Sequence, residues 1–211
     1  KCSETEAREI ARKETFQRVC VFGLGTTGMF IGDLIRQKYP EAKIVFVARS
    51  DEDSPKVSFA LKQAKADYVK SNFDTKEELA KAIMDKLGGT ATVFIGSSGA
   101  GIEQEIAFQY GVLGCNGIYN SFSLGPVVSF DTMPFGFKNQ VIFGSINFRQ
   151  DHMEEAIRIL EKSCYDEIVE LIDKGEFTED PIGAYENKIY SKSAPMKTAV
   201  IWNEKYIDAD R

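Results

Sequence analysis

Hydrophobic residues follow two different spacings along the chain up to residue 147. Short runs of apolar and β-branched residues predict buried strands, and apolar residues three or four positions apart predict amphipathic helices between them. The predicted strands cover residues 19–22, 43–47, 68–69, 91–95, 115–119 and 141–147. The predicted helices between them cover residues 26–39, 56–65, 75–87 and 102–110. Strands that alternate with helices predict an α/β fold, a doubly wound parallel sheet of the Rossmann type with helices on both faces.

Both ends of the chain predict elements outside this sheet. Ser3 and Glu6 have the spacing of a capping box, which predicts the start of a short charged helix that ends near Glu14. The C-terminal part predicts helices over 150–162 and 165–173, a helical turn over 181–185 and a strand over 197–202. We therefore expect three parts, which are a linking helix (1–15), a nucleotide-binding domain (16–163) and a C-terminal extension (164–211).

The first predicted strand ends in a Gly-x-Gly-x-x-Gly motif, directly before a predicted helix. Gly23 permits a tight turn, Gly25 lets the backbone approach a pyrophosphate, and Gly28 lets the helix pack closely on the strand. The free N–H groups of a helix that begins near Thr26 favour a bound phosphate. A plain glycine-rich turn has the same motif, but its position between a strand and a helix favours a dinucleotide site.

The end of the second predicted strand carries Arg49 and Ser50. In dinucleotide-binding folds this position meets the adenosine ribose, and an acidic residue there binds the 2′-hydroxyl of NAD. A guanidinium and a hydroxyl suit a 2′-phosphate instead, which favours NADP. Two alternatives stay open: Arg49 pairs with Asp51 or Asp53 in a solvated loop, or Asp51 reaches a ribose hydroxyl.

Two later strands end in polar or small residues that belong to the same edge of the sheet. The segment 96–101, Gly-Ser-Ser-Gly-Ala-Gly, lies where the first half of the fold passes to the second. It either borders the cofactor cleft or is a turn of small residues that avoids clashes. Asn120 follows the strand 115–119 and is a further candidate for cofactor binding.

Composition excludes several classes of protein. A net charge of -6 over 211 residues, without a basic patch, argues against nonspecific nucleic-acid binding. No apolar run approaches the ~20 residues that span a bilayer, and no secretory signal is visible, so we expect a cytoplasmic protein that does not bind membranes. His152 is the single histidine and the four cysteines are scattered, so we expect no metal site, His-based triad or disulfide framework. Cys20 and Cys115 are expected in buried strands.

Several segments, in order, resemble the cofactor-binding half of archaeal-type glucose dehydrogenases, which belong to the zinc-dependent medium-chain alcohol dehydrogenase superfamily. These segments are residues 23–28, 48–51, 66–69, 144–147 and 197–200. The resemblance implies that Gly25, Thr26 and Thr27 cradle the pyrophosphate. It also implies that Arg49 grips the 2′-phosphate of NADP, with Ser50 where a second arginine is often found, so that NAD use stays possible.

The same resemblance assigns the nicotinamide and sugar side of the site to Ser98, Gly99 and Asn147. In this family an N-terminal catalytic domain supplies the zinc ligands and much of the sugar pocket, and we expect this chain to lack that domain. The candidate cofactor-binding residues are Gly23, Gly25, Thr26, Thr27, Gly28, Arg49, Ser50, Ser98, Gly99, Asn120 and Asn147. No catalytic residue is expected in this chain.

The expected function is that of the NADP-binding domain of an oxidoreductase that moves hydride from C1 of an aldose to NAD(P). We expect zinc only in the catalytic domain, and the chain alone is expected to be nearly inactive. The apolar strand 141–147 is expected at the edge of the sheet, where it pairs with the same strand of a second subunit in a homodimer or homotetramer. The alternative is a non-catalytic nucleotide-binding sensor or regulatory module.

Overall fold

The computed structural model describes residues 3–126, 129, 131–144, 147–161, 165, 169–190 and 196–202. The chain divides into two compact units, Lys1–Ile146 and Asn147–Arg211. The predicted boundary between residues 163 and 164 therefore lies inside the second of these units. The domain assignment made from the sequence stays a prediction.

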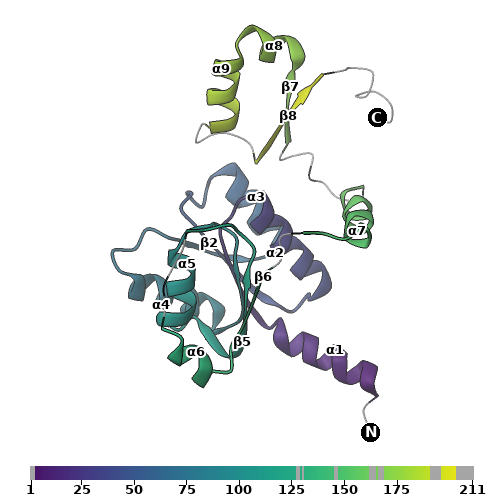
Figure 1. Cartoon of the computed structure of the whole chain (residues 1–211). Coiled ribbons are helices and arrows are strands. Elements are labelled where there is room, and N and C mark those ends of the chain that lie inside the picture. The colour runs from purple at the N-terminus through teal and green to yellow at the C-terminus, as the bar shows by residue number, and fades with distance from the viewer. Residues whose placement is uncertain are drawn as a thin grey trace. The chain divides into compact units, whose positions relative to one another are not determined.

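The first unit contains a six-stranded sheet with the order β3-β2-β1-β4-β5-β6, in which all neighbouring strands are parallel (Figure 1). The strands are β1 (Arg18–Phe22), β2 (Lys43–Ala48), β3 (Asp67–Lys70), β4 (Ala91–Gly96), β5 (Leu113–Ser121) and β6 (Val141–Gly144). The order reverses direction between β1 and β4, as in doubly wound folds that bind dinucleotides. The predicted fold class is confirmed.

Helices cover both faces of this sheet. They are α2 (Thr26–Lys38), α3 (Pro55–Ala64), α4 (Lys76–Leu87), α5 (Ile102–Gln104) and α6 (Met133–Phe137). Figure 1 shows α2 and α3 on one face and α4, α5 and α6 on the other. Gly32 of α2 lies directly against the ring of Phe46, because a Cβ at this position would overlap the ring. The missing side chain therefore lets α2 approach the sheet closely.

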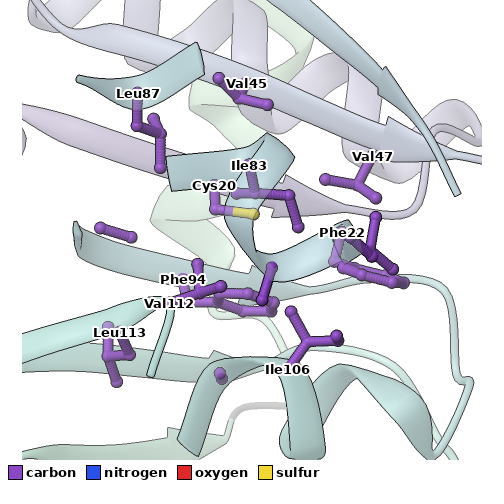
Figure 2. Close-up of a cluster of buried hydrophobic side chains, with 14 of the residues drawn as sticks. Cys20, Phe22, Val45, Val47, Ile83, Leu87, Phe94, Ile106, Val112 and Leu113 are labelled. Carbon is purple, nitrogen blue, oxygen red and sulfur yellow. The ribbon is translucent and has the colours of Figure 1, made fainter. Parts of the chain in front are cut away.

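The core on the α4 face is built from alternate residues of the central strands. Figure 2 shows Cys20 and Phe22 of β1 gathered with Ile83 of α4, Phe94 of β4 and Ile106. Phe94 stacks on Phe22 with ring centroids 6.0 Å apart. Burial of a large apolar side chain of this kind stabilises a fold by about 1.5–3 kcal/mol. Every residue from Val19 to Phe22 is buried, so the central strands are apolar on both faces and alternate residues serve the two faces.

Local capping signals place two helices as predicted. Helix α1 (Glu4–Thr15) begins at Ser3, where the Ser3 hydroxyl accepts the N–H of Glu6 and the Glu6 carboxylate accepts the N–H of Ser3. Helix α4 is capped by the Thr75 hydroxyl and ends at Gly88, which has a φ of 72°. Both ends follow from short-range chemistry that the sequence displays directly.

Two elements of the structure differ in detail from their predictions, which were a helix over residues 102–110 and a strand over 115–119. A π-helical segment, η1 (Glu105–Gln109), continues α5. The prediction that Cys115 is buried is wrong, because its side chain is exposed. Asn116 has a positive φ of 56°, and the register of β4 against β5 shifts between Ala91 and Val93. The strand bulges there, which turns Cys115 out of the sheet.

The second unit is smaller and contains a two-stranded parallel sheet. Its elements are α7 (Gln150–Leu160), β7 (Val169–Asp173), α8 (Lys174–Glu179), α9 (Pro181–Tyr185), η3 (Glu186–Tyr190) and β8 (Lys197–Ile201). The helical turn at α9 and the strand at β8 were predicted and are confirmed. The helix predicted over 165–173 is wrong at 169–173, where β7 pairs with β8. Pairing with a strand distant in the sequence overrides the short helical spacing. No helix in the described ranges is both long and apolar enough to cross a membrane.

Candidate functional site

A pocket of about 550 Å³ lies at the carboxyl ends of β1, β2 and β4. Its wall is formed by Phe22, Gly23, Leu24, Gly25, Val47, Ala48, Arg49, Ser50, Lys56, Ser71, Ser98, Gly99, Ala100 and Ile102. The strand order reverses between β1 and β4, and ligands of doubly wound sheets bind in the crevice at that point. The volume lies within the usual range for small-molecule and cofactor sites. The fold thus brings the two predicted glycine-rich turns and the end of β2 to one pocket.

The first glycine-rich turn is shaped by close backbone contacts. Gly23 has a φ of +110°, and its N–H donates to the Val47 carbonyl at 2.8 Å. A Cβ on Gly23 would lie 2.6 Å from the backbone nitrogen of Ser98, and a Cβ on Gly28 would overlap the Gly23 carbonyl oxygen. Both positions therefore need glycine to keep the turn packed.

Gly25 differs from these two glycines, because a Cβ there would meet nothing within 4 Å. It lines the pocket and precedes Thr26, the first residue of α2. No side chain caps this helix start, and its first turn contains no acidic residue. The positive end of the helix dipole is therefore not neutralised by the helix's own side chains next to the pocket. Thr26, Thr27 and Gly28 form that first turn but do not belong to the pocket wall.

The end of β2 supplies positive charge to the pocket. Arg49 and Lys56 both line it, together with the hydroxyls of Ser50 and Ser71. Among the residues that the structure describes, neither cation forms an ion pair, and no acidic residue belongs to the wall. This combination suits a dianionic phosphate group at the pocket rim.

The Asp51 carboxylate, which the sequence left open as a partner of Arg49, is instead paired with Lys70 of β3. Lys70 lies opposite Ala48 in the parallel register of β2 and β3, which brings its ammonium group beyond the end of β2. The ion pair described for Asp51 is therefore with Lys70. The interpretation in which Asp51 binds a ribose hydroxyl stays open, because a carboxylate paired with a lysine still has acceptor sites for a hydroxyl.

The second glycine-rich turn, 96–101, packs on the first. The Ser97 hydroxyl lies 2.9 Å from the Gly23 carbonyl oxygen and 3.1 Å from that of Phe22. Gly99 has a φ of +71°, and its N–H donates to the Ser123 hydroxyl at 2.8 Å. The segment borders the pocket and also consists of small residues in close contact, and a place beside a cofactor stays a prediction.

A buried carboxylate holds the second turn in place. Glu103 accepts the N–H groups of Ser98 at 2.9 Å and of Ala100 at 3.2 Å, and it also bonds the Ser98 hydroxyl. Burial raises the pKa of Glu103, while these hydrogen bonds act in the opposite direction. Burial and the nearby Glu103 also raise the pKa of Tyr119, whose hydroxyl lies 3.5 Å from the carboxylate. The turn is thus fixed from within by a group that does not itself line the pocket.

The two candidate asparagines lie in different units of the chain. Asn120 lies on β5, in register with Ile95 and Phe143, and is not part of the wall. Its Oδ1 atom is buried and has no hydrogen-bond partner in the described part of the chain. Asn147 belongs to the second compact unit, which is described by itself.

Sequence reasoning missed Lys56, Ser71 and Glu103. Lys56 follows Pro55 at the start of α3, and Ser71 follows β3, so neither belongs to the glycine motifs that mark the site. Glu103 had one local signal, because an acidic residue in the first turn of a helix bonds free N–H groups. Among the residues that the structure describes, no group of three His, Cys, Asp or Glu side chains has the arrangement of a metal site.

Neither protein-family models nor curated proteins give a match to the chain. Solved structures do resemble it. A glucose dehydrogenase from Haloferax mediterranei, described in complex with NADP, zinc and gluconolactone, has a TM-score of 0.68 and 17% identity, over 93% of this chain and 55% of that one. A 2R,3R-butanediol dehydrogenase from Bacillus subtilis has a TM-score of 0.66 and 20% identity, over 89% of this chain and 51% of that one. An alcohol dehydrogenase from Thermotoga maritima has a TM-score of 0.66 and 18% identity, over 88% of this chain and 50% of that one.

These similarities show a shared fold. The chain spans about half the length of each of these dehydrogenases. The structures include a glucose dehydrogenase, the type of enzyme that the sequence motifs resemble.

Proposed function

We propose that the first unit binds NADP and that the chain is the cofactor-binding portion of a sugar or polyol dehydrogenase. The observation that carries this proposal is the pocket at the reversal of strand order. Arg49 and Lys56 both line its wall, and no acidic residue does. An acidic residue at the end of β2 is typical of NAD sites, and cationic side chains there suit the 2′-phosphate of NADP. Substrate class and reaction are proposed from the similarity in fold to solved dehydrogenases.

Each part of the cofactor has matching residues in this chain. The backbone at Gly25, Thr26 and Thr27 suits the pyrophosphate, because the start of α2 has neither a capping side chain nor an acidic first turn. Arg49 and Lys56, with the two serine hydroxyls beside them, suit the 2′-phosphate. The turn that contains Ser98 and Gly99 borders the rest of the pocket, where the nicotinamide half would lie. When bound, the nicotinamide ring would accept the hydride that such a dehydrogenase removes from its substrate.

The similar enzymes support the remaining parts of this proposal. The Haloferax mediterranei structure contains NADP, zinc and gluconolactone, which favours an aldose as substrate and a zinc-binding catalytic domain as the partner of this chain. We place the metal in that domain, and we expect this chain alone to bind the nucleotide without appreciable turnover. Asn147 is proposed to lie beside the nicotinamide in the intact enzyme, Asn120 stays a candidate for cofactor binding, and the location is proposed to be cytoplasmic.

The edge strand β6 supports a subunit contact. Val141, Ile142 and Phe143 are 52%, 40% and 47% exposed, although all three are large and apolar. An apolar edge strand of this kind is prone to pair with another strand. We propose that β6 pairs with its own copy in a homodimer or homotetramer, which sedimentation of the chain and of a Phe143→Lys variant would test. A monomeric wild-type chain would contradict this part.

The cofactor proposal is tested by calorimetric titration of the chain with NADP, NAD and ATP. We expect NADP to bind at least ~10-fold more tightly than NAD, and this difference to be lost in Arg49→Ala and reduced in Lys56→Ala. Lys62→Ala is the matched control, because Lys62 is an exposed cation of the same helix, α3, outside the pocket wall. Binding of ATP alone would contradict the proposal and favour a nucleotide sensor.

A further inference from the structure

The hydroxyl of Tyr68 reaches past the end of the neighbouring strand. Tyr68 lies on β3, opposite Phe46 of β2, and is 6% exposed. Its oxygen lies 2.7 Å from the Ser50 carbonyl oxygen and 3.2 Å from that of Ala48. The single proton of this buried hydroxyl is therefore within hydrogen-bond distance of the carbonyl oxygens on both sides of Arg49, and the shorter contact is to Ser50.

Other contacts hold the same backbone, which leaves little freedom around Arg49. The Ala48 carbonyl also accepts the N–H of Ser71 at 2.7 Å, which extends the β2–β3 ladder. On the far side, the Asp51 carbonyl accepts the Ser54 hydroxyl at 2.7 Å. Between these two anchors, the Ser50 carbonyl is held by Tyr68. The Tyr68 hydroxyl thus helps to fix the backbone from which the Arg49 side chain extends.

The Tyr68 hydroxyl stays protonated over the physiological pH range and therefore remains a hydrogen-bond donor. Burial, followed by the negative charges of Asp51 and Glu52, raises the pKa of Tyr68 to about 12. Two cations belong to the same region of the sheet, Lys70 on β3 and Arg49 directly after β2, and Lys70 is paired with Asp51. The Tyr68 hydroxyl therefore keeps its contact with the two carbonyl oxygens at every physiological pH at which nucleotide binding is measured.

We propose that Tyr68 is a positioning residue that sets the preference for a 2′-phosphorylated dinucleotide by fixing the backbone on both sides of Arg49. The inference rests on the proposed function, since it assigns a role within the same pocket. It requires no contact between Tyr68 and the nucleotide, and Tyr68 does not belong to the pocket wall. It also explains why Arg49 can be directed to the pocket although its side chain is exposed and unpaired in the described part of the chain.

The test is a double-mutant cycle of Tyr68→Phe and Arg49→Ala, titrated with NADP and NAD and with two fragments, adenosine 2′,5′-bisphosphate and AMP. Removal of one hydrogen-bonding hydroxyl is expected to weaken NADP and the bisphosphate ~5-fold. NAD and AMP are expected to change less than ~2-fold, because neither carries the 2′-phosphate that Arg49 would bind. In the Arg49→Ala background, Tyr68→Phe is expected to have no further effect on NADP.

Controls separate positioning from general damage to the fold. Tyr39→Phe also removes a tyrosine hydroxyl, outside the pocket wall, and should leave all four affinities unchanged. Thermal unfolding of each variant reports loss of stability independently of the ligands. Equal weakening of NADP and NAD, or a loss that persists without Arg49, would overturn the role of Tyr68 and indicate a structural effect.

The two proposals can fail separately. A wild-type chain that prefers NADP, with an unchanged preference in Tyr68→Phe, would overturn only the inference about Tyr68. A wild-type chain that binds both dinucleotides equally, or neither, would overturn the proposed NADP site and the role of Tyr68 together.

Discussion

The Ser97 hydroxyl lies 2.9 Å from the Gly23 carbonyl oxygen, and this contact joins the two glycine-rich turns of the pocket. The turns follow β1 and β4, which are neighbours in the sheet although more than seventy residues separate them in the sequence. Their packing is so close that a Cβ on Gly23 would lie 2.8 Å from the Ser97 carbonyl carbon. The shape of the pocket beside Gly23 is therefore a joint property of both turns.

Ser97→Ala tests this connection. Loss of the hydroxyl leaves the carbonyl oxygens of Phe22 and Gly23 without this donor, so we expect the free energy of unfolding to fall by about 1 kcal/mol. Affinities for NADP and NAD should fall together, because in the proposed binding mode the 2′-phosphate lies at the other end of the pocket. Urea unfolding and calorimetry measure the two effects. Thr15→Ala, which removes an exposed hydroxyl bonded within α1, is the control and should leave affinity unchanged.

Two glycines of the same motif are expected to respond in opposite ways to alanine. Gly28→Ala places a methyl group on the Gly23 carbonyl oxygen, so we expect a loss of about 2–3 kcal/mol in unfolding free energy. Gly25→Ala meets no atom within 4 Å and has an ordinary φ of -96°, so stability should stay within about 0.5 kcal/mol.

The same Gly25→Ala variant should bind NADP at least ~10-fold more weakly, because its methyl group occupies the space through which a pyrophosphate approaches the backbone. Chemical denaturation and calorimetry of the purified variants separate the two effects. Unchanged NADP affinity in Gly25→Ala would argue against a pyrophosphate at this turn.

The pair of Lys70 and Asp51 predicts an effect of charge on selectivity. Lys70→Met leaves the Asp51 carboxylate without this cation near Arg49, so NADP affinity should fall ~3-fold while NAD affinity changes less. In Asp51→Asn the same lysine substitution should have little effect, since there is then no carboxylate to neutralise. Titration of the wild-type chain, the two single variants and the double variant at low and high salt gives the coupling free energy between Lys70 and Asp51. Additive losses would instead mean that Lys70 acts on the nucleotide directly.

The raised pKa of Tyr68 predicts a difference in stability at alkaline pH. The pKa rises from 10.0 to about 12 in the folded chain, so the proton is bound more tightly in the folded state. The resulting stabilisation is complete below pH 10 and is lost as the pH rises through about 12. Relative to Tyr68→Phe, the wild-type chain should lose up to about 2 kcal/mol of unfolding free energy over this range. Urea unfolding at several pH values measures the difference, and parallel curves would contradict it.

Local chemistry in the sequence was sufficient for the fold class and for much of the site. Short runs of apolar and β-branched residues place β1, β2 and β4, and the capping residues Ser3 and Thr75 place α1 and α4. The Gly-x-Gly-x-x-Gly spacing identified the turn at Gly23, and the end of β2 identified Arg49. These features depend on neighbours a few residues away, which is why a single sequence displays them.

Tertiary structure alone decided the features that depend on distant partners. The pattern over 165–173 predicted a helix, but β8 pairs with residues 169–173 and makes them a strand. The sequence left Asp51 as a candidate partner of Arg49, and the parallel register of β2 and β3 gave it to Lys70. Tyr68 of β3 acts on the carbonyl group of Ser50 beyond the end of β2, which only folding brings within hydrogen-bond distance. The sequence by itself determined most strands, helices and turns of the first unit, because those choices depend largely on local spacing. Which charged and hydroxyl groups meet across neighbouring strands was decided only when the sheet fixed their register.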